Sequence, residues 1–203
     1  ELFHDASVRV PLIIYDPDSA ADTTRGTVCD KLVEAMFWSA GQLYDLGFKE
    51  NTGAVPVFEP KVRTFEVYNL KTGAPVGLLY LDNFARDGKR SGAWMTTYRS
   101  QQGLGGTRTV LASNNNNFTA GVGGEPTLIS LDDADTLFHE FGHGIHYMLQ
   151  NVYYPALAGV PRDFVEYPSQ VNENWLQTPE VLNRFAVHYK TGAPIPKALV
   201  AKI

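Results

Sequence analysis

The sequence predicts an α+β fold in which helices accompany a small β-sheet. Three observations predict it: helical spacing of apolar residues near the start, two alternating segments in the middle, and a long amphipathic segment around residue 140. The chain has 203 residues, of which 44% are hydrophobic and 19% charged, the composition of an ordinary globular protein. The sequence is therefore able to bury a core.

The first predicted elements are a helix and a hairpin. Apolar residues recur three or four apart over residues 28–46, which predicts a helix. Residues 62–68 and 76–82 alternate and carry β-branched or aromatic side chains, and the segment between them, 71–75, contains Gly and Pro. This pattern predicts two strands joined by a turn. Residues 107–112 predict a further strand.

The second half is predicted to be helical after one long loop. Residues 113–124 include four consecutive Asn residues, and this low-complexity run predicts a mobile surface loop, with a substrate-binding segment as the alternative. Helices are predicted over residues 131–150, 163–176 and 179–189. Residues 1–27 stay unassigned.

The most informative stretch is His139-Glu140-Phe141-Gly142-His143, inside the predicted helix 131–150. Residues four apart share a helix face, so both imidazoles can reach one metal ion. Glu140 projects beside them, where a carboxylate can take a proton from a water. Two His residues and one further ligand leave a fourth zinc position open, as catalytic sites require. The pattern predicts a zinc hydrolase, above all a peptidase.

The flanks of this stretch support a buried helix. Ser130 is a candidate N-cap, and Asp132 and Asp133 follow it in the first turn. A glycine costs about 1 kcal/mol relative to Ala inside a helix, so Gly142 predicts the close approach of another backbone or of a substrate.

The third metal ligand is narrowed by elimination. One class of these sites continues the helix with Gly and then a third His, but His146 and Leu149 stand at those positions. The other main class takes a Glu from a following helix, and Glu166 is favoured for this role on spacing. Asp163, one helical turn away, is the rival ligand, since either carboxylate can bind zinc.

These residues resemble the thimet oligopeptidase family of zinc metallopeptidases. Its two zinc motifs are matched in order by 139–146 and 163–170, and further matches lie at 35–38, 84–87 and 91–95. The forms Arg162-Asp163-Phe164-Val165-Glu166 and Asn172-Glu173-Asn174-Trp175 are most similar to the bacterial dipeptidyl carboxypeptidases.

The resemblance implies one zinc ion per chain, with His139, His143 and Glu166 as ligands and Glu140 as general base and proton shuttle. It implies a mainly helical catalytic domain with a small β-sheet packed by the zinc-binding helices. Residues 28–203 would form part of that domain. Because family members are several times larger, the chain is expected to be a fragment whose oxyanion-stabilising residues lie beyond Ile203, and to be weak or inactive alone.

The expected function is hydrolysis of short peptides, releasing C-terminal dipeptides. The alternatives are an oligopeptidase that cuts internal bonds, a non-catalytic zinc-binding module, and a scaffold that never binds metal. A net charge of −5 without a Lys or Arg cluster argues against nucleic-acid binding, and no apolar run is long enough to span a membrane. A monomer in the cytoplasm is expected, with the periplasm as the alternative.

Several residues near the motif have competing interpretations. Asp135 and Glu173 are candidates to orient a ligand imidazole, with solvated or capping carboxylates as the alternative. The small residues 91–93 would let a peptide backbone approach as an added strand, or would close a loop onto Trp94.

Four other residues are predicted to have no chemical role. Cys29 is expected to be a small buried hydrophobic residue and His146 to be structural. His4 and His188 are expected at the surface.

Overall fold

The α+β prediction is confirmed by a computed structural model, which describes residues 28–123, 126–189 and 191–201. The strands are β1 (Leu46–Glu50), β2 (Arg63–Asn69), β3 (Pro75–Phe84), β4 (Trp94–Arg99) and β5 (Val110–Phe118). The helices are α1 (Val28–Tyr44), α2 (Leu131–Met148), the short 3₁₀ helix η1 (Pro155–Ala158), α3 (Glu166–Glu173), α4 (Pro179–Phe185) and α5 (Lys197–Val200). The unassigned segment 1–27, with His4, lies outside the described residues.

The strands form one mixed sheet in the order β1-β2-β3-β5-β4. The predicted hairpin is confirmed, because β2 and β3 pair antiparallel with Phe65 opposite Leu79. The later strand β5 inserts between β3 and β4, running parallel to β3 and antiparallel to β4. This order leaves β4 at an edge of the sheet.

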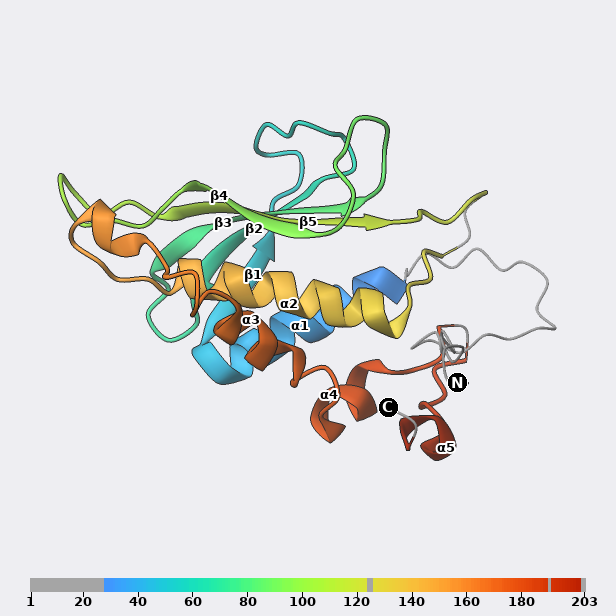
Figure 1. The fold of residues 1–203 in the computed structure, drawn as a ribbon. Coiled ribbons are helices and arrows are strands. Elements are labelled where there is room, and N and C mark those ends of the chain that lie inside the picture. Colours follow the sequence, from blue (N-terminus) through green and yellow to red (C-terminus); the bar gives the residue numbers. More distant parts are fainter. Residues whose placement is uncertain (1–27, 124–125, 190, 202–203) are drawn as a thin grey trace, which may run out of the picture.

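Helices cover one side of the sheet. Figure 1 shows α1 and α2 lying on the same side of the sheet, with α3 packed along α2. The core between these layers is rich in aromatic rings: Phe37 stacks on Phe48, with ring centroids 4.0 Å apart, and both rings contact Phe141 of α2. The helix that carries the His-Glu motif is therefore fixed by the main core.

The prediction of a mobile loop at 113–124 is wrong for its first half. Residues 110–118 form β5, and the Asn residues at 114, 115 and 116 are buried inside the sheet. Polar side chains can occupy a central strand when they find hydrogen-bond partners, and the amide nitrogen of each of these three side chains does so. Composition alone suggested a solvated loop because it does not show those partners.

Other boundaries also differ from the predictions. β1 and β4 were not predicted as strands, and α3 begins at Glu166 rather than at residue 163. His188 was expected at the surface but is buried, and its Nδ1 accepts a hydrogen bond from the Thr191 backbone N–H at 3.1 Å.

Cys29 is buried as predicted, and burial raises the pKa of its thiol to about 12. The thiolate is therefore disfavoured there, and the residue acts as a small hydrophobic side chain.

No helix among the described residues is both long and apolar enough to cross a membrane.

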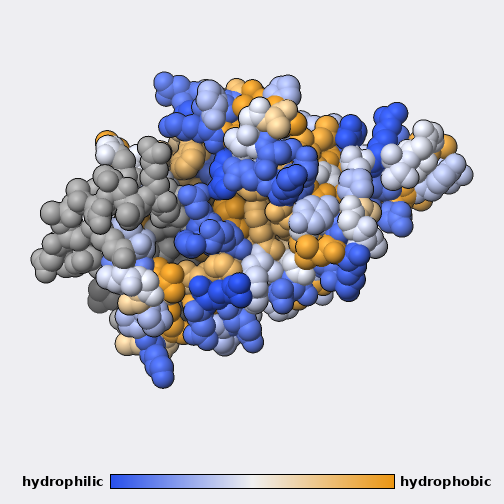
Figure 2. Space-filling model, turned by 180° about the vertical axis from the view of Figure 1, so that it is seen from behind, coloured by the Kyte–Doolittle hydropathy of each residue, from blue (hydrophilic) through white to orange (hydrophobic). Residues whose placement is uncertain are grey.

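Apolar side chains also reach the surface. On the reverse side of the molecule, Figure 2 shows hydrophobic residues exposed between hydrophilic patches. Leu43, Leu149 and Tyr167 are among the exposed large apolar side chains. Such surface typically marks a contact with another part of a protein or with a ligand.

Candidate metal centre

The predicted N-cap of α2 is confirmed. The Ser130 hydroxyl accepts a hydrogen bond from the Asp133 backbone N–H at 3.1 Å, and the Asp133 carboxylate accepts one from the Ser130 backbone N–H at 3.0 Å. This reciprocal capping box satisfies two N–H groups that a helix start would leave unpaired. It fixes where α2 begins and therefore which face its later residues present.

The helix α3 docks closely on α2 at Gly142. A Cβ at this position would lie 2.6 Å from the Cα of Ser169 and 2.9 Å from the Cβ of Asn172, so only a glycine allows the approach. The Asn172 side chain donates to the backbone carbonyl of Phe138 at 2.6 Å. The close approach predicted from Gly142 is thus made by the backbone of α3.

This docking brings three metal-ligating side chains together. Oε2 of Glu166 lies 3.1 Å from Nε2 of His139 and 3.3 Å from Nε2 of His143. One ligand atom from each of the three residues lies within 4.8 Å of the other two. The rival carboxylate Asp163 is exposed and is not a member of this group.

A second set of contacts orients these donors. Nδ1 of His139 hydrogen-bonds Oε1 of Glu173 at 2.5 Å, which leaves Nε2 directed toward Glu166. The Ser169 hydroxyl lies 2.8 Å from the backbone carbonyl of Glu166 and 3.2 Å from its Oε2, and it can donate to either oxygen. Asp135, the other candidate for orienting His139, instead bonds Gln177 through one oxygen, while its Oδ1 is buried with no partner among the described residues.

Glu140 is placed for proton transfer. It is buried beside His139, and burial raises the pKa of its carboxyl; the charge of His139 and a hydrogen bond from the Met95 backbone oppose this rise, and Glu166 adds to it. Burial also lowers the pKa of His143, which favours the neutral imidazole that can act as a ligand. A raised carboxyl pKa suits a group that must both accept and return a proton.

Two hollows flank the cluster. One, of about 300 Å³, is lined by Ala93, Trp94 and Met95 on one side and by the cluster with Tyr147 on the other. The second, of about 410 Å³, is lined by Asp135, Thr136 and Glu173 together with His139, Glu140 and Ala93. Ala93, the residue directly before the edge strand β4, lines both hollows. The start of β4 therefore lies next to the cluster.

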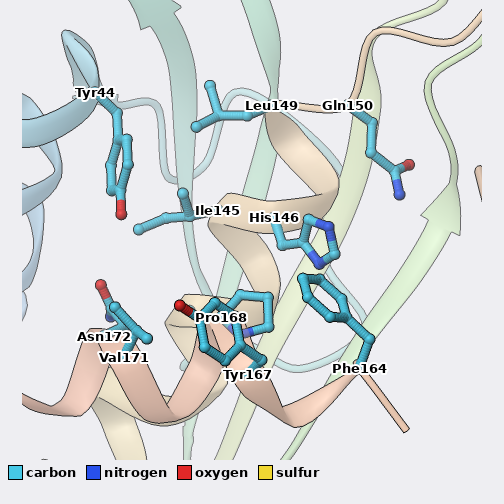
Figure 3. A pocket seen from close by; sticks show the side chains of 11 residues that line it. Tyr44, Ile145, His146, Leu149, Gln150, Phe164, Tyr167, Pro168, Val171 and Asn172 are labelled. Carbon is cyan, nitrogen blue, oxygen red and sulfur yellow. The ribbon is translucent and has the colours of Figure 1, made fainter. Parts of the chain in front are cut away.

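A separate groove lies between α2, α3 and the end of α1. It has a volume of about 450 Å³, and Figure 3 shows Ile145 from α2 and Leu149, which caps that helix, facing Tyr167 and Val171 from α3. His146 lines this groove rather than the hollows around the cluster, and its ring contacts Phe164 edge-on at 6.2 Å. The structure thus places His146 apart from the metal-ligating group, in agreement with the structural role predicted for it.

Sequence reasoning missed the residues that hold α3 in place. Ser169 follows Glu166 by one helical turn, and a hydroxyl at that spacing could have been recognised as a partner for its carboxylate. No local signal marks Asn172 or the Asn run of β5, because their partners lie on segments distant in the sequence.

Known proteins are similar in sequence to most of this chain. The sequence model of Peptidase family M3 matches residues 15–203. The chain is 43% identical over 174 residues to the dipeptidyl carboxypeptidase of Escherichia coli strain K12, covering 85% of this chain and 25% of that protein. It is 41% identical over 179 residues to oligopeptidase A of Salmonella typhimurium, covering 86% and 26%. The chain therefore spans about a quarter of the length of the curated relatives it matches.

Proposed function

The chain belongs to peptidase family M3, and on this basis we propose that the whole protein is a zinc-dependent metallopeptidase that hydrolyses short peptides. The observation that carries the proposal is the convergence of His139, His143 and Glu166 on one point beside the buried carboxylate of Glu140. The predicted resemblance to this family of peptidases is confirmed by the matches.

The donor set fits zinc. Two imidazole nitrogens and one carboxylate oxygen are the ligands of many catalytic zinc sites, and they leave one position for a reactant. The ring of His139 is fixed through Nδ1 by Glu173, the kind of outer partner that orients zinc-binding imidazoles. We therefore assign one zinc ion to His139, His143 and Glu166.

The remaining residues define the mechanism. When bound, zinc would supply Lewis-acid chemistry, acidifying a water and polarising the substrate carbonyl. Glu140 accepts the proton of the attacking water and delivers it to the leaving amine, a double role that its raised pKa supports. The wall formed by Ala93, Trp94 and Met95 positions the peptide, whose main chain can pair with an edge strand.

The experiment that tests this proposal replaces the base without disturbing the ligands. Glu140→Gln in the whole protein should keep its zinc, measured by mass spectrometry, while peptide hydrolysis falls roughly 10²–10⁴-fold. Glu180→Gln, an exposed residue in the first turn of α4, is the matched control and should keep full activity. Near-normal turnover by Glu140→Gln would remove Glu140 from the mechanism, and an inactive wild-type protein that holds zinc would favour a non-catalytic zinc module.

The mode of cleavage has two candidates, since relatives named dipeptidyl carboxypeptidase and oligopeptidase A match with similar identity. We favour release of C-terminal dipeptides, on the form of the motif at residues 162–175. Recognition of a free C-terminus needs a cationic or hydroxyl partner for the carboxylate. Cleavage of a peptide and of its C-terminally amidated form by the whole protein decides between them: equal cleavage of both, or products cut at internal bonds, would favour the oligopeptidase.

The cytoplasmic location, the monomeric state and the domain boundary at residue 28 stay predictions.

A further inference from the structure

Among the described residues, no strand pairs with the outer side of the wall that faces the metal centre. Ala93, Trp94 and Met95 line the hollow that contains His139 and Glu140, and β4, which begins at Trp94, is an edge of the sheet. The position of this segment fixes where an extended peptide can lie above α2. What holds the segment at that position is therefore a question about substrate binding.

Asparagine side chains from β5 hold it. Nδ2 of Asn117 donates to the backbone carbonyls of Arg90, at 2.8 Å, and Gly92, at 2.6 Å. Nδ2 of Asn115 donates to the carbonyl of Trp94 at 2.9 Å. The backbone carbonyls of three alternate residues in the segment 90–94 thus accept hydrogen bonds from side chains of the neighbouring strand β5.

The other two asparagines of the run face the opposite way. Nδ2 of Asn114 lies 3.4 Å from the carbonyl of Leu137 on α2, two residues before His139. Nδ2 of Asn116 donates to Oδ1 of Asn83, at 3.0 Å, and to Oδ1 of Asn114, at 3.2 Å. Because side chains alternate along a strand, the same run contacts the helix of the metal centre on one face and the wall on the other.

Lys89 adds a second anchor at the base of this segment. Its side chain is only 2% exposed, and Nζ donates to the carbonyls of Asp82, Phe84 and Asn116 and pairs with the Asp82 carboxylate at 3.0 Å. A buried ammonium that satisfies its donors in this way rigidifies the backbone it contacts. The indole of Trp94 then lies against the guanidinium of Arg90, 4.5 Å from the ring centroid.

We propose that the run Asn114–Asn117 and Lys89 form a positioning device that holds the segment 90–94 at a fixed height above α2 and thereby sets the affinity for extended peptide main chain. This inference rests on the proposed peptidase function. These side chains act through the backbone of the wall and are positioning residues. A peptide loses affinity when the wall moves, whereas a ligand that contacts only the metal centre does not.

The test compares two inhibitors on the zinc-loaded whole protein. A peptide hydroxamate has an extended main chain that can lie along the wall as well as a group that binds the metal centre, whereas acetohydroxamate has only the metal-binding group. Asn117→Ala, and Asn117→Asp, which keeps the shape but cannot donate, should weaken the peptide hydroxamate about tenfold or more. Binding of acetohydroxamate and zinc content should be unchanged, and KM should rise more than kcat falls.

The matched control is Asn51→Ala, which removes an amide that donates to Glu66 near the opposite edge of the sheet, at 3.3 Å. It should leave both inhibitors unaffected. Lys89→Met should also weaken the peptide hydroxamate. Because the Lys89 side chain is buried, this variant can fail to fold, and in that case the Asn117 variants decide the test. If the Asn117 variants lost affinity for both inhibitors equally, or for neither, the positioning role would be overturned. Peptide hydrolysis by the wild-type protein would still support the proposed function in that case. A wild-type protein that cleaves no peptide would instead overturn both.

Discussion

Two pairs of elements enclose the proposed metal centre, and the sequence encodes them differently. The helices α2 and α3 carry the proposed ligands, whereas the strands β4 and β5 form and support the facing wall. In the helix pair the informative residues lie three or four positions apart, so the pattern can be recognised in the sequence. In the strand pair they act through partners remote in the sequence, so the same functional importance leaves almost no local signal.

The largest expected effect concerns the ligands on the helix pair. His143→Ala or Glu166→Ala should lower zinc affinity by more than about 100-fold, because losing an orienting partner alone costs 10–100-fold. Competition with a chromophoric chelator measures this directly. Asp163→Ala, the rival carboxylate, is the control and should change the affinity only slightly. A larger loss with Asp163→Ala than with Glu166→Ala would reverse the assignment.

The second prediction tests the contact that joins the two helices. Gly142→Ala places a methyl group 2.6 Å from the Cα of Ser169, so α3 must move and carry Glu166 with it. We expect a loss of about 1–3 kcal/mol in the free energy of unfolding, as for other overpacked sites, together with weaker zinc binding.

Gly144→Ala is the matched control on the same helix. The nearest neighbour of the new methyl group would be the Phe141 ring at 3.9 Å, and replacing a helical glycine should stabilise the protein by about 0.5–1 kcal/mol. Urea unfolding of both variants provides the comparison. Unchanged stability and zinc affinity in Gly142→Ala would mean that the helices are not held together at this point.

The sequence predicts local features of this molecule well and pairings between distant segments poorly. Ser130, the His-Glu motif and the helix 131–148 were predicted closely, because capping and helical periodicity are local properties. The hairpin of β2 and β3 was predicted because a short turn joins its strands. The insertion of β5 between β3 and β4 could not be predicted, since it depends on pairing between distant segments. For this reason the composition of the Asn run predicts a loop, although the run lies in a strand.

The third prediction separates a buried strand from the loop that composition suggested. Asn116 is fully buried, and Asn116→Ala would leave Oδ1 of Asn83 without its donor. We expect the free energy of unfolding to fall by about 1–2 kcal/mol, the cost of an unsatisfied buried polar group. Denaturant unfolding measures the loss. Asn69→Ala is the comparison for a turn site, because Asn69 ends β2 and its Oδ1 accepts hydrogen bonds from the backbone of the exposed turn that follows. If Asn116→Ala cost no more than Asn69→Ala, the Asn run would behave as a loop.

The smallest expected effect compares how the two regions hold buried charge. Beside the strand pair, the ammonium of Lys89, in the segment before β4, pairs with the carboxylate of Asp82 on β3. On α2, Asp135 forms no ion pair within the part of the chain that the structure describes, and burial, Glu173 and Asp132 raise the pKa of its carboxyl from 3.8 to about 6. Because the folded state holds this proton more tightly than the unfolded state, the contribution of Asp135 to stability is fully present below about pH 4 and is lost as the pH rises through about 6.

Asp135→Asn should therefore raise the melting temperature above that of the parent at pH 8, and the difference should shrink through pH 6 and vanish near pH 4. The side chain is partly solvated, so after allowance for solvent screening the gain should not exceed about 1 kcal/mol. Metal-free protein is the material to use, because zinc binding has a pH dependence of its own. High salt should reduce the part of the difference that comes from Glu173 and Asp132 and leave the part that comes from burial. A difference that stays constant from pH 4 to pH 8 would show that the substitution acts through packing and not through the charge of Asp135.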